Sequence, residues 1–524
     1  MIDRYDLVLR NGQIIDGTGA AAYRADLGIR GDSIVAIGDL DGADAVAVVD
    51  VSGLVVSPGF IDLLGWSHGP VLVDPNLEGK IRQGVTTEAT GEGRSPGPVV
   101  DDEGDGADQR VVRTLGDFMR KVEIGGTALN FALFVGATNP REMVLGKNNV
   151  QPTEEQLQQM ERIVEQAMLE GAIGLSTSLV YVPAIYASTD EIVRLARVAA
   201  KYGGVYFSHI RSESDEIEQA LEEAFEIGRR TGIPVNIWHL KVTDRTNEGK
   251  MVRVLAMIED ARRQGLDVAA NSYPYAASST GLTALAPNWS LEGGYGAFLR
   301  RLSDSETRSG IAVEIRESSF YRRVGGAAGV LVSNIGNPDL DRYEKKFLSE
   351  IALEMGVDPI EALLRLLEQN EMSPQAIYFS MKEEDVRMAL ARSWVSVGAD
   401  SGAVVGEMRE AGAHPRAYGT FPRVVGHYVR DVKLFSLEEA VRKITSQAAS
   451  RIRLNDRGIL RVGMKADIVV FDPEEIRDVS TFEDPHHFSE GIIHVIINGV
   501  SVLRDGEMTG ALPGRILRGV GYRE

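Results

Sequence analysis

Cysteine is absent from the 524-residue sequence. Its absence excludes disulfides, thiolate nucleophiles, iron–sulfur clusters and zinc held by cysteine. Histidine is scarce as well, with 8 residues in the whole chain. A metal ion would therefore have to be held by these few histidines, by Asp or Glu, or by a modified Lys.

The sequence also has no long apolar run, and it has fewer positively than negatively charged residues. No run approaches the roughly 18 residues of a membrane-spanning helix, and the start, MIDRYDLVLRNGQ, carries charge too early for a signal peptide. Lys and Arg number 56 against 76 Asp and Glu, a net charge of −20, which repels phosphate backbones and anionic lipid. We therefore expect a soluble cytoplasmic protein with neither a nucleic-acid nor a membrane partner. The sequence leaves the oligomeric state open.

Both ends of the chain are rich in segments with the sequence pattern of β-strands. Residues 5–55 contain three strand-like segments, and similar segments occur at 465–475 and 491–510. The turn signals Asn11-Gly12, Gly31-Asp32 and Ser52-Gly53 predict antiparallel strands joined by two-residue hairpins. We expect residues 1–55 and 451–524 to form one small β-sandwich.

The middle of the chain, residues 56–450, alternates apolar runs with amphipathic helical patterns, which is typical of parallel strands joined by crossover helices. Eight such runs occur, at 59–68, 85–93, 129–138, 171–181, 203–211, 234–242, 266–275 and 394–402. Their number predicts a (β/α)8 TIM barrel with an insertion near 276–390. A doubly wound open sheet is the alternative fold, and the strand count favours the barrel.

Polar residues close most of these runs, and the active site of such a barrel lies at the carboxyl ends of its strands. His209 and His239 could bind one divalent cation through neutral imidazole nitrogens. Asp400 could bind the same ion or take a proton from its water, as metal-assisted hydrolysis requires. The alternative is that both histidines are ordinary polar residues at the rim of the barrel. The full set of candidates at strand ends is His68, Glu92, Tyr181, His209, His239, Lys241, Tyr273 and Asp400.

Segments from end to end of the chain resemble a known family. They are NGQIIDGTGA, VVSPGFID, GVTTEATGEG, GAIGLSTSLVYVPAIYAST, FSHIRSES, IPVNIWHLKV, NSYPYAASST, HPRAYGTFPRVVGHYVR, KADIVVFDP, TFEDPHHFSEGI and GALPGRILRG. With these segments the sequence resembles the amidohydrolase superfamily and, within it, the N-acyl-D-amino-acid deacylases, or D-aminoacylases. The resemblance implies a metal-bearing barrel, a β-sandwich built from both termini, and hydrolysis of an acyl–amide bond.

The resemblance also implies roles for individual residues. His209 and His239 match the two histidines of the family's tightly bound zinc, and Asp400 matches its general acid/base. The positions that hold the substrate's carboxylate and acyl groups are matched by Tyr181, Lys241, Tyr273 and Arg416. The planar guanidinium group of an Arg and the ammonium group of a Lys are suited to binding a free carboxylate.

The first two strands depart from the family pattern. Leu64 and Trp66 stand where the superfamily has His-x-His, so the second metal position is lost or rebuilt. His68 lies on the same face of the strand as both of them, and Glu92 falls within one position of the family's bridging Cys. Either residue could supply a new ligand. We expect about one zinc ion per chain, in a tetrahedral site.

The expected function is metal-dependent hydrolysis of an N-acyl-D-amino acid, a small-molecule substrate. Two alternatives stay open at this point. One is an amidohydrolase acting on a cyclic amide, an imide or a dipeptide. The other is a catalytically silent ligand-binding homologue, which Leu64 and Trp66 keep in consideration and the retention of His209, His239 and Asp400 opposes.

Overall fold

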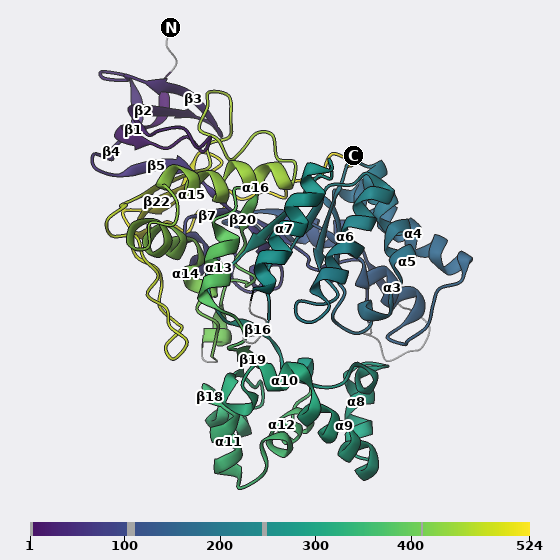
Figure 1. The fold of residues 1–524 in the computed structure, drawn as a ribbon. Coiled ribbons are helices and arrows are strands. Elements are labelled where there is room, and N and C mark those ends of the chain that lie inside the picture. Colours follow the sequence, from purple (N-terminus) through teal and green to yellow (C-terminus); the bar gives the residue numbers. More distant parts are fainter. Residues whose placement is uncertain (1–3, 102–110, 244–248, 410–411, 524) are drawn as a thin grey trace.

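The computed structural model describes residues 4–101, 111–243, 249–409 and 412–523 (Figure 1). It shows three regions. A sheet built from both ends of the chain lies at the top left of Figure 1, a ring of strands wrapped by helices fills the middle, and an inserted region lies at the bottom. Among the described residues, none of the helices combines the length and the apolar character needed to cross a membrane.

The ring has eight strand positions, all paired in parallel, which confirms the predicted TIM barrel. The third position is divided into two short strands, and a parallel bridge from Gly65 to Ser401 closes the ring. Each predicted run contains its strand. The strands are β6 (Phe60–Gly65), β7 (Val85–Thr90), β10 (Asn130–Leu133), β11 (Val135–Gly136), β12 (Gly174–Ser178), β13 (Val205–His209), β14 (Val235–Ile237), β15 (Val268–Ser272) and β20 (Val395–Val397).

Helices cover the outside of the ring. In α4 (Glu154–Glu170) the buried residues recur at helical spacing, so one apolar face packs on the strands. Thr153 caps its start by accepting a hydrogen bond from the Gln156 N–H, and Gly171 ends it in a left-handed conformation. The others are α1 (Glu78–Ile81), α2 (Leu115–Gly125), α3 (Thr138–Leu145), α5 (Thr189–Lys201), α6 (Ile217–Thr231), α7 (Lys250–Arg263), α13 (Glu383–Leu390), α14 (Arg416–Arg423), α15 (Leu437–Ile444) and α16 (Ser446–Arg451).

The two ends of the chain meet in one nine-stranded sheet, because β5 pairs antiparallel with β21. Its strands are β1 (Tyr5–Ile14), β2 (Tyr23–Arg30), β3 (Ser33–Gly38), β4 (Ala45–Asp50), β5 (Val55–Pro58), β21 (Ile468–Phe471), β22 (Ile492–Ile497), β23 (Val500–Arg504) and β24 (Glu507–Met508). A buried hydrogen bond from Asn130 of the ring to Asp467, 2.9 Å long, ties this sheet to the barrel. The domain limits at residues 55 and 451 stay a prediction.

Two of the predicted hairpins in this sheet are wrong. Gly31-Asp32 does join β2 to β3 as an antiparallel hairpin. Asn11-Gly12, in contrast, lies inside β1, where the register shifts at a bulge and Asn11 has a φ of 62°. Ser52-Gly53 separates β4 from β5, and both of these strands run parallel to β1.

The insertion follows β15 and has a hydrophobic core of its own, which includes Phe298, Ile311 and Leu363. Its antiparallel sheet has the order β16-β19-β17-β18. Thr280 on β16 contacts Tyr181, which follows β12 of the ring. The bounds are β16 (Ser278–Gly281), α8 (Tyr295–Leu302), α9 (Ser305–Glu317), α10 (Ser319–Arg323), β17 (Val330–Asn334), β18 (Lys346–Phe347), α11 (Leu348–Met355), α12 (Pro359–Glu368) and β19 (Gln375–Tyr378). A separate two-stranded antiparallel sheet is formed by β8 (Val99–Asp101) and β9 (Val111–Arg113).

Candidate active site

Glu92, His209 and His239 converge at the carboxyl ends of β7, β13 and β14. Oε1 of Glu92 lies 2.7 Å from Nδ1 of His209 and 3.2 Å from Nε2 of His239. The two imidazole nitrogens are 3.0 Å apart. All three side chains are buried. Three ligand atoms of these types, each within 4.8 Å of the others, form a candidate site for one metal ion.

Local backbone geometry places two of these side chains. Glu92 stands between two glycines, and Gly93 has a φ of +60° and approaches Ser178 so closely that a Cβ would lie 2.4 Å from the Ser178 Cβ. His239 itself has a φ of 36°, an unfavourable value for a residue with a side chain. Its N–H donates a 2.6 Å hydrogen bond to Oδ1 of Asn271 on β15. The neighbouring strand therefore holds His239 in the conformation that presents it to the cluster.

A second carboxylate, Glu213, contacts the ring nitrogen of His239 that does not face Glu92. Its Oε1 lies 2.9 Å from Nδ1 of His239 and accepts a 2.6 Å hydrogen bond from Nζ of Lys241. A partner for Nδ1 directs Nε2 toward Glu92, as second partners of metal-binding histidines do. Burial and the charge of Lys241 would lower the pKa of His239, but Glu213 and Asp400 outweigh them and raise this pKa to about 9.

The donor set fits zinc. Burial would raise the pKa of Glu92, but the hydrogen bonds from His209 and His239 outweigh burial and hold this pKa below its usual value. Glu92 is therefore an ionised carboxylate beside two imidazole nitrogens. Two nitrogens and one carboxylate oxygen are the protein ligands of a common type of catalytic zinc site, in which the fourth position stays open to water or substrate.

Asp400 follows β20 at the same carboxyl end of the ring, close enough for its charge to act on His239 of the cluster. It has a φ of 51°, and its N–H donates a 2.7 Å hydrogen bond to the Leu64 carbonyl on β6. Oδ1 of Asp400 accepts a hydrogen bond from the indole N–H of Trp66 at 3.3 Å. Oδ2 lies 2.8 Å from Nη1 of Arg416. Both carboxylate oxygens thus face a donor, and the backbone is fixed to the first strand.

The buried side chain of Lys80 binds the loop that carries Asp400. Nζ of Lys80 donates to Oδ2 of Asp62 at 2.7 Å and to the Ser401 carbonyl at 2.6 Å, and it lies 3.5 Å from Oε2 of Glu88. The side chains of Lys80, Asp62 and Glu88 have no exposed surface. Burial raises the pKa of Glu88 to about 6, although Lys80 acts in the opposite direction. This ion cluster joins the first two strands to the residue that follows Asp400.

Replacing Lys80 by methionine is expected to lower the free energy of unfolding by about 3–5 kcal/mol, because it leaves buried carboxylates without their cation. Chemical denaturation measures this loss. The matched control is Lys465→Met, which removes a partly exposed partner of Asp32 and should cost no more than about 1 kcal/mol. Equal losses in the two variants would contradict the structural role of Lys80.

The predicted substrate-binding residues surround the cluster. The ring of Tyr273 has the Arg416 guanidinium carbon 4.7 Å from its centre and Nζ of Lys241 at 5.7 Å. Two cations therefore share one aromatic neighbour. The ring of Tyr181 lies 5.3 Å from that of His209, and its hydroxyl is 2.8 Å from Oγ1 of Thr280 on β16. Through Tyr181 the insertion contacts the metal-ligand cluster.

The first strand supplies no ligand to the cluster among the described residues. Leu64 is fully buried, and Trp66 contacts Asp400. Nδ1 of His68 instead pairs with Oγ1 of Thr90 at 2.9 Å, and burial lowers the pKa of His68 to about 4. The structure therefore groups Glu92, and not His68, with the two histidines.

Sequence reasoning missed Glu213 and Lys80. Glu213 follows His209 by four residues in the loop after β13, within the SHIRSES segment. Its position after a strand that ends in a candidate ligand is a usable signal, since such loops form the mouth of the barrel. Lys80 gives no comparable signal, because it lies on a one-turn helix, α1, and its partners come from β6, β7 and the loop after β20.

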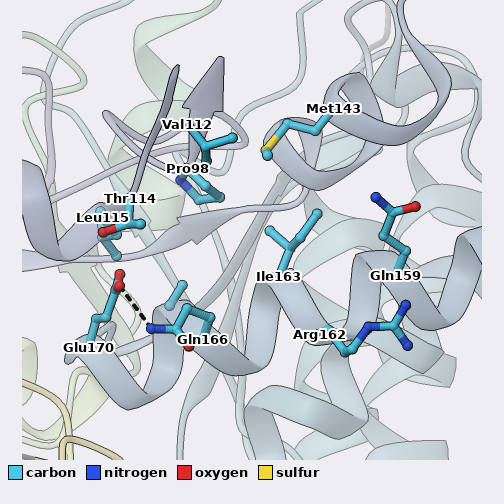
Figure 2. A pocket seen from close by; sticks show the side chains of 11 residues that line it. Pro98, Val112, Thr114, Leu115, Met143, Gln159, Arg162, Ile163, Gln166 and Glu170 are labelled. Carbon is cyan, nitrogen blue, oxygen red and sulfur yellow. Dashed lines mark hydrogen bonds between the residues drawn. The ribbon is translucent and has the colours of Figure 1, made fainter. Parts of the chain in front are cut away.

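A pocket of about 230 Å³ lies elsewhere, against the outer face of α4 (Figure 2). Its lining includes Pro98, Val112, Met143, Ile163 and Arg162. None of the residues that line it belongs to the Glu92 cluster or contacts Asp400. The pocket is therefore separate from the candidate active site.

Comparison with known proteins gives one consistent picture. A model of the amidohydrolase family matches residues 395–503. A D-aminoacylase from Alcaligenes xylosoxydans xylosoxydans is 37% identical over 523 residues, which cover 98% of this chain and 97% of that relative.

Solved structures agree with the sequence match. A crystal structure of N-acyl-D-glutamate deacylase from Bordetella bronchiseptica, complexed with zinc and a phosphonate inhibitor, is similar with a TM-score of 0.84 and 32% identity. The match covers 98% of this chain and 100% of the deacylase chain. A second similar structure is that of a D-aminoacylase whose binuclear metal centre shows one-metal activation and second-metal attenuation. Its TM-score is 0.83 and its identity is 36%, and the match covers 98% of this chain and 100% of that chain.

Proposed function

The chain belongs to the D-aminoacylase family of amidohydrolases, and from that premise we propose how its own residues act. The protein hydrolyses the amide bond of an N-acyl-D-amino acid, releasing a carboxylate and the free amino acid. One observation carries the residue assignment: the Glu92–His209–His239 cluster lies beside Asp400. A metal-ligand set and a carboxylate able to move protons are thus combined at one end of the barrel.

The direct test is hydrolysis of N-acetyl-D-amino acids by the zinc-loaded protein, with the L-enantiomers as controls. We expect release of free D-amino acid and little release from the L-substrates. If no member of a panel covering neutral, acidic and basic D-amino acids is hydrolysed, the assignment is wrong.

Glu92, His209 and His239 would hold the zinc ion, at about one ion per chain. When bound, zinc supplies a Lewis acid that polarises a carbonyl and lowers the pKa of a water molecule. Glu213 keeps Nδ1 of His239 partnered, so Nε2 stays directed at the site. Neither Leu64 nor the indole of Trp66 offers a ligand atom for a second ion.

Asp400 would carry the protons. It accepts a proton from the attacking water and passes it to the leaving amine nitrogen, so that the amine departs neutral. In the structure Arg416 lies against Oδ2 of Asp400 at 2.8 Å. The α-carboxylate of a substrate competes for the same guanidinium, and its binding would free Oδ2 for proton transfer.

Arg416 and Lys241 would bind the α-carboxylate of the substrate, with Tyr181 and Tyr273 lining the pocket. Arg416→Ala should lower kcat/KM for an N-acyl-D-amino acid by roughly ten- to a hundredfold, the effect of losing one charge-assisted contact. Kinetics with the methyl ester of the same substrate provide the control, because the ester has no charge to lose. Equal losses on acid and ester would count against a carboxylate clamp.

The other functions are less well supported. Similarity to deacylases along nearly the whole chain supports a linear amide rather than a cyclic amide, an imide or a dipeptide. The convergence of three ligand residues beside Asp400 opposes a silent ligand-binding homologue. A cytoplasmic location stays a prediction of the sequence.

A further inference from the structure

Trp66 is the residue at which this chain departs most from its family. It directly follows the first strand of the barrel, β6, at the position where the superfamily has the second histidine of His-x-His. Its indole N–H points at the catalytic carboxylate and lies 3.3 Å from Oδ1 of Asp400. Trp66 and Asp400 are 334 residues apart in the sequence, so the contact depends on closure of the barrel.

We infer that Trp66 is a positioning residue that acts through Asp400 and takes over, with a neutral donor, the support that a second metal ion would otherwise give this carboxylate. The inference rests on the proposed role of Asp400 as the proton carrier. Trp66 itself touches neither the attacking water nor the leaving group.

The contacts of Asp400 show why a neutral donor suits this position. Arg416 occupies Oδ2, which the substrate's carboxylate would release, and Trp66 occupies Oδ1. An indole N–H only donates and does not titrate in the accessible pH range. It therefore orients the carboxylate at Oδ1 without adding a positive charge, and leaves Oδ2 to the exchange between Arg416 and the reacting groups.

The surroundings of Trp66 hold it in place. Its backbone N–H points to the Ser401 carbonyl at 3.4 Å, the same carbonyl that binds Lys80. The next residue, Ser67, donates its N–H to buried Glu88 at 2.8 Å. The buried ion cluster therefore sets the relative position of the indole and of Asp400 from both sides.

The first experiment compares Trp66→Phe with the matched variant Trp289→Phe. Trp289 also donates its indole N–H to a carboxylate, Glu314, at 3.1 Å, but on the exposed surface of the insertion. We expect Trp66→Phe to lower kcat by roughly tenfold, the lower end for a hydrogen bond to a charged group. KM, zinc content and Tm should stay near those of the parent protein. Trp289→Phe should leave kcat unchanged.

Two outcomes would overturn the inference. One is an unchanged kcat in Trp66→Phe. The other is a loss confined to KM or Tm, which would assign the ring a packing or substrate-binding role. If the unmodified protein hydrolyses no N-acyl-D-amino acid, the proposed function has failed, and that result is distinct from both.

A second measurement does not depend on catalysis. The chain has 4 tryptophans, so NMR of protein labelled with ¹⁵N at the indoles gives a small set of signals. Trp66→Phe identifies the Trp66 signal by its loss. Asp400→Asn is expected to shift that signal, because it changes the charge of the acceptor. A Trp66 signal that stays in place in Asp400→Asn would show that the contact is not made and would overturn the inference.

Discussion

Replacing Asp400 by asparagine is expected to reduce kcat by at least roughly a thousandfold, within the range of a lost general acid–base group. Asparagine keeps the size of the side chain and an oxygen for the Trp66 N–H, but it accepts no proton at neutral pH. Zinc content should stay at its wild-type value, because Asp400 is not one of the three clustered ligands. Steady-state kinetics and elemental analysis of the same preparation measure both quantities.

Asp478→Asn is a matched control for this change. Asp478 also pairs with an arginine, Arg423, at 3.0 Å, but it lies outside the metal-ligand cluster. Its variant should keep turnover near the wild-type value. Near-normal kcat in Asp400→Asn, or a similar loss in both variants, would refute the proton-transfer role.

Replacing His239 by alanine is expected to remove the bound zinc together with activity. The variant leaves two of the three clustered residues, Glu92 and His209, and removes the ring that Glu213 contacts at Nδ1. Loss of one ligand from a three-ligand site removes a large part of the metal affinity. Dialysis against buffer without zinc, followed by elemental analysis, measures the retained metal.

Two further variants separate ligation from general damage. Glu92→Cys should retain zinc, because a thiolate is also a zinc ligand. His68→Ala should retain zinc as well, because His68 pairs with Thr90 outside the cluster. Full zinc retention in His239→Ala, or zinc loss in His68→Ala equal to that in His239→Ala, would contradict the assignment of the ligands.

The sequence predicted those parts of the fold and site that depend on strand order. Each barrel strand coincides with an apolar run, and parallel strands bring their carboxyl ends to one side. Strand order alone therefore predicts that His209, His239 and Asp400 lie at the same end of the barrel. The sequence leaves His68, Glu92 and Asp400 as candidates for a third ligand, because the spacing after β7 departs from the family pattern.

Features that depend on loop conformation or long-range contact could not be predicted in this way. Glu213 reaches His239 only through the path of the loop after β13. The donation from Trp66 to Asp400 needs closure of the barrel between its first and last strands. Asn11-Gly12 has the composition of a hairpin turn but forms a bulge inside β1, in its pairing with β2. There the Asn11 N–H donates to Oδ1 of Asp26 and its side-chain amide donates to Oδ1 of Asp50, contacts that depend on residues far along the chain.

Titration of metal-free protein with zinc, with the hydrolysis rate of an N-acetyl-D-amino acid recorded at each addition, tests whether Glu92, His209 and His239 hold one catalytic zinc ion. The site described here predicts no activity without metal, a linear rise, and a plateau at about one zinc ion per chain. A rise that continues to about two ions per chain, or hydrolysis by the metal-free protein, would contradict it.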